Sequence, residues 1–108
     1  MIGDLLNNII QAIRNRDYIL SAHYWEDRAG QSSRPLPSSI VASIGNNEPE
    51  VIEHYPNDHR GASCLILGKN GKGNFIHSFI GYSVHPIKIC TAYYPDRSVW
   101  INNRERRR

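Results

Sequence analysis

The 108-residue sequence is poor in sulfur, with two cysteines and one methionine. Cys64 and Cys90 lie inside short apolar runs and lack the C-x-x-C spacing of a zinc site. We therefore expect buried, reduced thiols rather than a disulfide or a metal pair. No apolar stretch approaches the roughly 18 residues that span a bilayer, and the first residues lack the basic region of a secretory signal. These absences favour a cytoplasmic protein without membrane contact.

Several catalytic signatures are also missing. No G-x-S-x-G surrounds a serine nucleophile, and no H-x-x-x-H or H-x-H places two metal ligands on one element. The acidic residues are too scattered to predict the paired carboxylates of glycosidases. Residues 68–73 contain glycine and lysine without the phosphate-loop pattern, so a hairpin turn is expected there. No cofactor is predicted, although a metal held by His23, His77 and a carboxylate stays open as an alternative.

Charge is close to balanced, because 13 Lys and Arg against 10 Asp and Glu give a formal net charge of +3. Much of this excess lies in residues 104–108, which are expected to form a solvated basic tail, with nucleic-acid contact as the alternative. The length predicts a single domain over residues 1–108. It comprises a leading helix at 1–17, a main body at 18–103 and the tail.

Hydrophobic periodicity predicts helices first and strands later. Residues 4–16 carry apolar side chains at helical spacing, facing either the core or a partner helix. Residues 18–22 fit a strand or extended link, and two short helices follow at 23–28, capped by Ser21, and 38–44. The segments with strand character are residues 51–55, 64–67, 75–82 and 87–94. We expect an α+β domain with N-terminal helices packed on one face of a small, mainly antiparallel sheet of about four strands.

The pairing of the last two strands depends on the turn at residues 83–85. A three-residue turn places His77 opposite Thr91, whereas a two-residue turn places it opposite Cys90. We favour the first, the one of the two that puts His77, Thr91 and Tyr93 on one face. Alternation in the last strand places Ile87 and Ile89 on that same face as Thr91 and Tyr93.

Polar residues with catalytic potential surround this sheet. His77 lies in mid-strand as a hydrogen-bonded core histidine or as an acid–base group, and His23 opens a helical turn. Metal-independent RNA cleavage requires a base, cationic donors for the phosphate and an acid. Histidine, Arg60 and Tyr93 meet those needs. Asp58 either orients such groups or forms a structural ion pair with Arg60 that fixes the turn.

The spacing of these residues resembles one bacterial family. Residues 55–68 read Y-P-N-D-H-R-G-A-S-C-L-I-L-G and resemble the pattern Y-P-x-D-x-R-G-x-S-C-L-x-L-G. Ser21-Ala-His23, an Ile-His77 pair, T-A-Y-Y-P-D at residues 91–96 and Trp100 accompany it. Together they resemble the domain of unknown function 4258 family over about residues 18–108. The resemblance implies a RelE-like or barnase-like fold and a toxin-like endoribonuclease, with RNA as substrate and a small zinc-finger antitoxin protein as partner.

Carried over by position, the motif residues divide into two sets. The expected catalytic residues are His77, Arg60, Tyr93 and His23, and the expected substrate-binding residues are Tyr55, Asp58, Ser63 and Thr91. The sequence departs from the family at Tyr24-Trp25 and in an insert at residues 30–37, which leaves Arg28 in doubt as a site residue. The alternative function is a non-catalytic interaction domain of the same fold that binds RNA or a protein.

Overall fold

The computed structural model describes residues 2–45 and 48–107, and its helices precede most of its strands. The helices are α1 (Ile2–Arg14), α2 (Ala22–Gly30) and α3 (Pro37–Gly45). The strands are β1 (Tyr18–Leu20), β2 (Glu50–Tyr55), β3 (Ser63–Lys69), β4 (Phe75–Gly81), β5 (Ile87–Tyr93), β6 (Trp100–Ile101) and β7 (Glu105–Arg106). Each helix and strand expected from periodicity is therefore found within a few residues of its predicted bounds. Met1 and Arg108, the ends of the predicted single domain, lie outside the described residues.

The main sheet has the order β1-β5-β4-β3-β2, and β6 and β7 form a separate pair. Strands β2 to β5 are antiparallel, while β1 pairs with β5 in parallel. The α+β class and the mainly antiparallel sheet are thus confirmed. The sheet has five strands rather than about four because Tyr18–Leu20 joins it as an edge strand.

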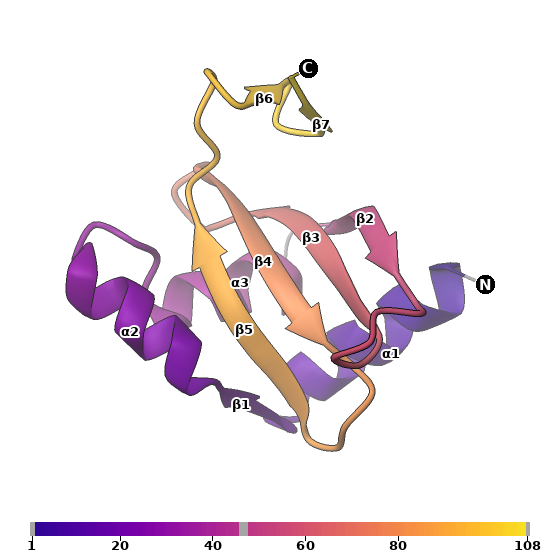
Figure 1. The fold of residues 1–108 in the computed structure, drawn as a ribbon. Helices are drawn as coiled ribbons and strands as arrows, with labels where there is room; N and C mark the ends of the chain where they lie inside the picture. Colours follow the sequence, from indigo (N-terminus) through magenta and orange to yellow (C-terminus); the bar gives the residue numbers. More distant parts are fainter. Residues whose placement is uncertain (1, 46–47, 108) are drawn as a thin grey trace.

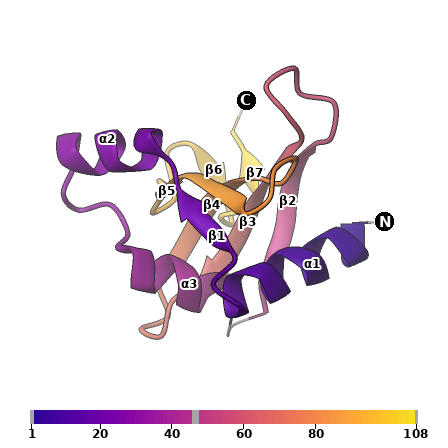
Figure 2. The ribbon, with the colours of Figure 1, turned by 90° about the horizontal axis from the view of Figure 1, so that it is seen from below.

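Helices α1 and α3 cover one face of this sheet (Figures 1 and 2). The apolar side of α1 buries Ile9 and Ile13, which confirms that its stripe faces the core. Each isoleucine buried in this way contributes about 1.5–3 kcal/mol relative to an exposed side chain. Gly68 allows α3 to approach β3 closely, because a Cβ atom at this position would lie 2.1 Å from the Ser43 carbonyl oxygen. The buried face of α1 and the close approach of α3 at Gly68 together position the helices on this face of the sheet.

A bulge in β5 changes which residues share a face of the sheet. Ile80 pairs with Ile89, but Phe79 pairs with Thr91, so Cys90 is the extra residue. Ile89 therefore faces the helices, while Thr91 lies on the opposite face. The prediction that Ile87, Ile89, Thr91 and Tyr93 share one face is wrong, because simple alternation does not survive a bulge.

The β6–β7 hairpin covers part of the other face (Figure 2). Trp100 is 3% exposed, and its ring lies edge-on to His77 with centroids 4.3 Å apart. The basic end predicted to be a solvated tail takes part in this hairpin. Arg104, Arg106 and Arg107 remain exposed, but Arg104 pairs with Glu50 and Arg106 pairs with Glu53.

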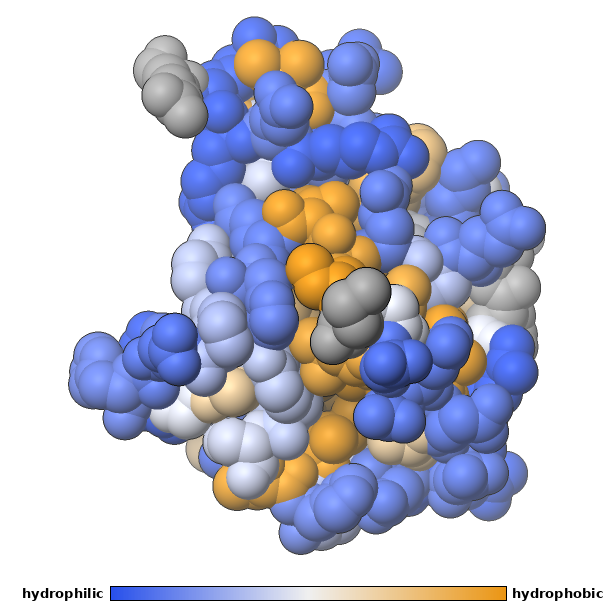
Figure 3. Space-filling view, turned by 90° about the vertical axis from the view of Figure 1, so that its right-hand side faces the viewer, coloured by the Kyte–Doolittle hydropathy of each residue, from blue (hydrophilic) through white to orange (hydrophobic). Residues whose placement is uncertain are grey.

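The side of the molecule formed by α1 and the edge strand β2 is partly apolar. Figure 3 shows a strip of hydrophobic residues there between hydrophilic borders. Leu5, Leu6 and Val51 are partly buried against the core and belong to these two elements. None of the helices in the described part of the chain is long and apolar enough to cross a membrane.

Candidate functional site

A groove lies on the sheet face opposite α1 and α3, near the β2–β3 loop and the β4–β5 turn. It has a volume of about 530 Å³ and is lined by the start of α2, the β2–β3 loop and strands β3 to β5. We call it the sheet groove. The predicted site residues that line it are His23, Asp58, Arg60, Ser63 and Thr91. Five of the eight predicted residues, from three distant segments, therefore meet at one cavity.

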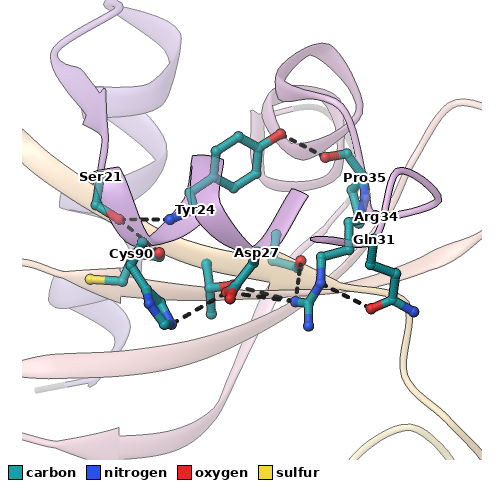
Figure 4. A network of polar contacts seen from close by, with 10 residues as sticks. Ser21, Tyr24, Asp27, Gln31, Arg34, Pro35 and Cys90 are labelled. Atoms are coloured by element: carbon teal, nitrogen blue, oxygen red, sulfur yellow. Dashed lines mark hydrogen bonds and ion pairs between the residues drawn. The ribbon is translucent and has the colours of Figure 1, made fainter. Parts of the chain in front are cut away.

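Asp27 is the centre of a polar network at one wall of the groove (Figure 4). Its Oδ2 accepts a hydrogen bond from Thr91 Oγ1 and lies 3.3 Å from His23 Nε2. His23 and Asp27 are four positions apart on α2, which places them on the same helix face. This contact places the Nε2 side of the imidazole against the carboxylate, while the His23 side chain stays 65% exposed.

Side chains at the start of α2 tie it to β5 and to the insert at residues 30–37. Ser21 caps α2, since its Oγ accepts a hydrogen bond from the Tyr24 backbone N–H and donates one to the Cys90 carbonyl oxygen. This cap confirms the predicted start of the helix. The Tyr24 hydroxyl donates a hydrogen bond to the Pro35 carbonyl oxygen. The insert at residues 30–37 is thus tied to α2 and brings its own side chains to the site.

Arg34 enters the network from that insert. Its guanidinium donates to the Ala92 carbonyl oxygen and the Thr91 hydroxyl at 3.3 and 3.5 Å, and its Nη1 lies 3.8 Å from Asp27 Oδ2. Arg34 therefore supplies a positive charge beside the carboxylate that holds His23.

The turn at Asp58 presents Arg60 to the groove. The Asp58 carboxylate accepts the Arg60 backbone N–H at 2.8 Å and lies 3.5 Å from its Nε, which lowers the pKa of Asp58. Gly61 continues the turn with φ of 112°, and a Cβ atom there would lie 2.4 Å from Ser83 Oγ. The predicted structural pair is thus present. It leaves the Arg60 side chain 77% exposed for a further contact.

Ser63 is 5% exposed and lines the same groove. Within the described ranges its hydroxyl finds no hydrogen-bond partner. Buried polar groups without a partner are uncommon, and a bound ligand or water satisfies them. Lys88 lines the groove as well, so a buried hydroxyl and two cationic side chains border a single space.

His77 lies outside the groove and beneath the hairpin. It is fully buried, with Nδ1 3.2 Å from the Tyr93 hydroxyl and Nε2 2.6 Å from the Asn103 carbonyl oxygen. Burial lowers the pKa of His77, although the Asn103 carbonyl and Glu53 act in the opposite direction. The ring is thus neutral, with Nε2–H donating to Asn103 and Nδ1 accepting from Tyr93.

The predicted pairing of His77 is wrong. The residue opposite it is Tyr93, and Thr91 lies opposite Phe79. His77, Thr91 and Tyr93 nevertheless share a face, because His77 lies directly opposite Tyr93 and the alternation from Thr91 to Tyr93 is regular on this side of the bulge. Tyr55 donates its hydroxyl to Glu53, and its ring lies 6.2 Å from Phe79, which lines the groove. Tyr55 is therefore adjacent to the groove, whereas His77 and Tyr93 form an interior pair.

The sequence interpretation missed the partners that organise this site. Asp27 could have been found from the His-x-x-x-Asp spacing within the predicted helix. The position of Arg34 could not be predicted in this way, because the insert at residues 30–37 shows only an interruption of the helical pattern. In the described part of the chain no cluster of three or more His, Cys, Asp or Glu side chains is suited to hold a metal ion. Burial raises the pKa of the Cys64 thiol to about 12, which excludes it as a reactive thiolate near neutral pH.

Fold and groove together define a small α+β domain whose sheet carries an open groove bordered by the cations Arg60 and Lys88. A family model described as "Domain of unknown function (DUF4258)" matches residues 7–94, and the chain belongs to this family. The match includes most of α1 and ends at Tyr94, so its extent differs from the expected residues 18–108 and leaves the β6–β7 hairpin outside. Comparison with curated proteins and with solved structures gave no significant match.

Proposed function

We propose that the sheet groove binds single-stranded RNA and cleaves it without a metal, as in a toxin-like endoribonuclease. The observation that carries this proposal is the convergence of His23, Arg60 and Thr91 on one groove, with Asp27 holding the imidazole. Histidine exchanges protons near neutral pH, which suits it to act as a general base.

The reaction begins at His23. Its Nδ1 takes the proton of a ribose 2′-hydroxyl, and the resulting 2′-oxygen attacks the adjacent phosphorus. The bond from phosphorus to the 5′-oxygen breaks, and this leaving oxygen takes a proton from water. The hydroxide that remains takes the proton back from His23, which restores the neutral imidazole. The products are a 2′,3′-cyclic phosphate and a 5′-hydroxyl end.

Cationic donors stabilise the charge that develops on the phosphate. Arg60 and Lys88 line the groove, and the buried Ser63 hydroxyl gains a partner when it donates to a phosphate oxygen. A base stacks on Phe79, whose ring is supported by Tyr55. In this arrangement His77 and Tyr93 support the sheet, and the base is His23.

The test is cleavage of a labelled RNA in the presence of a metal chelator, with detection of the cyclic phosphate. His23→Gln should lower the rate by about 100-fold or more, the range for loss of a general base. Asp27→Asn should also lower it, because the imidazole loses its orienting carboxylate. His59→Gln is the matched control, since His59 is highly exposed and does not line the groove. Equal cleavage by wild type and His23→Gln would refute the proposed site.

A non-catalytic RNA- or protein-binding domain is the second candidate. It is favoured by one observation: among the described residues that line the groove, His23 is the only imidazole. This function predicts RNA or partner binding with no cyclic-phosphate product from any variant.

Toxicity and its neutralisation form a separate part of the proposal. A toxin half should arrest growth when expressed alone, and co-expression with a neighbouring small zinc-finger protein should restore growth. Growth arrest that persists in His23→Gln would separate toxicity from RNA cleavage.

A further inference from the structure

A second cavity lies at the other end of α2. It has a volume of about 490 Å³ and is bordered by α2, the insert at residues 30–37, the first turn of α3 and the β3–β4 turn. We call it the α2–α3 pocket. The cationic residues that line it are Arg28, Arg34 and Lys72, and no Asp or Glu is among its described lining residues. Such a pocket attracts anions.

The three cations come from separate segments and are individually positioned. Arg28 donates from Nη1 to the Ser32 carbonyl oxygen, and Arg34 is held by Thr91 and Ala92. Lys72 lies in a turn fixed by the buried Asn70, whose Oδ1 accepts the backbone N–H groups of Lys72 and Asn74. In the described ranges the Lys72 ammonium forms no ion pair.

The remaining lining groups suit a nucleotide. Ser38 and Ser39 of the first turn of α3 supply hydroxyls at the positive end of a helix. Tyr94 is 42% exposed and offers an aromatic face at the same pocket. An aromatic ring beside phosphate-binding cations is the combination found in single-strand binding sites.

The pocket is connected to the sheet groove through Asp27. This carboxylate contacts Thr91 and His23 on the groove side and Arg34 on the pocket side (Figure 4). His23 and Arg28 are five positions apart on α2, about 7.5 Å along a helix axis. The two cavities therefore lie near the two ends of the same short helix.

We propose that the α2–α3 pocket binds a second phosphate of the RNA strand held in the sheet groove, with a base or ribose against Tyr94. The inference rests on the proposed function, because the groove must hold the first nucleotide. It makes the substrate an RNA strand of several nucleotides rather than a free nucleotide, and it assigns Arg28 a role in substrate binding.

The experiment measures binding of 2′-O-methylated RNA, which cannot be cleaved, to the intact chain. A hexanucleotide spans both cavities, while a dinucleotide occupies the groove alone. Lys72→Ala and Arg28→Ala should each weaken hexanucleotide binding by about three- to tenfold and leave dinucleotide binding unchanged. Arg97→Ala is the matched control, since it removes one exposed cation that lines neither cavity.

The outcomes separate this inference from the proposed catalysis. Selective loss of hexanucleotide binding supports the pocket even where wild type cleaves no RNA. Hexanucleotide binding that is unchanged in both variants overturns the pocket, whatever the cleavage assay gives. Failure of wild type to bind the hexanucleotide, or equal binding of an acidic peptide of the same charge, also overturns it.

Discussion

At the scale of single residues, His77 is the position where the role suggested by the residue type differs from its surroundings in the structure. A histidine in mid-strand fits either an acid–base group or a hydrogen-bonded core residue, and this one is fully buried with both ring nitrogens in hydrogen bonds. The imidazole joins the sheet to the hairpin, because it is hydrogen-bonded both to Tyr93 of β5 and to Asn103 between β6 and β7. The geometry therefore favours a structural role, and the catalytic role stays a prediction.

Replacement of His77 should destabilise the fold. His77→Ala removes a buried ring and leaves the Asn103 carbonyl and the Tyr93 hydroxyl without their partner. We expect a loss of about 2–4 kcal/mol in the free energy of unfolding, measured by urea denaturation. The exposed His59→Ala serves as control and should change little. A His77→Ala protein with wild-type stability would contradict the role of the imidazole as a joint.

The pKa of His77 also predicts how stability depends on pH. Burial lowers this pKa in the folded state, with Glu53 and Arg106 acting from β2 and β7 in opposite directions. Because the unfolded chain binds a proton first, stability should be fully present above a pH of about 6.5 and fall as the pH is lowered through that value. Urea midpoints measured from pH 8 to pH 5 should decline more steeply for wild type than for His77→Gln. Parallel declines would show that other groups dominate.

At the scale of elements, much of the fold follows from local pattern. Apolar residues at helical spacing predicted α1, and Ser21 predicted the start of α2, because helix periodicity and capping are local properties. The bulge at Cys90 was not predictable in the same way, since one extra residue leaves the alternation intact on either side. The register of β4 and β5 came out two residues off at His77, because the turn is one residue longer than expected and the bulge adds another. His77 and Tyr93 were nevertheless correctly placed on one face.

The sequence predicted which polar residues belong to the site, but not how they are arranged around it. His23 and Arg60 were expected from their chemistry, Ser63 and Thr91 from the resemblance to the family motif, and all four meet in the sheet groove. The separation of His77 from that groove depends on Trp100 and Asn103, which are more than 20 positions away in the chain. Contacts at such distances are set by tertiary packing, which no local pattern encodes.

The β6–β7 hairpin offers a test at this scale. Arg106 donates twice to the Glu53 carboxylate and lies 4.7 Å from the Trp100 ring centroid, whereas Arg104 makes a single ion pair with Glu50. Arg106→Gln should therefore release the hairpin more than Arg104→Gln, by about 1 kcal/mol after allowance for solvent screening. Hydrogen exchange of the Trp100 and Arg106 amides should quicken in the first variant. Equal exchange in the two variants would contradict the anchoring role of Arg106.

At the scale of the whole molecule, the distribution of charge matters more than its total. The formal net charge is only +3, and two arginines of the basic end are engaged by Glu50 and Glu53. Other cations line the two cavities on either side of Asp27: Arg60 and Lys88 in the groove, and Arg28, Arg34 and Lys72 in the pocket. An anionic ligand would therefore meet its cations at these two cavities, although the composition as a whole is only weakly basic.

This placement predicts the salt dependence of RNA binding. Each phosphate neutralised on a single strand contributes about −0.7 to the slope of log affinity against log salt concentration. With Arg60 and Lys88 in the groove and Arg28 and Lys72 in the pocket, the slope for a 2′-O-methylated hexanucleotide should be about −3. Lys88→Ala should make it less steep by about 0.7, and Arg97→Ala should leave it unchanged. Because affinity alone also falls when a stacking contact is lost, the slope identifies the phosphate contacts. A slope near zero, or one that Lys88→Ala does not alter, would contradict RNA binding along this path.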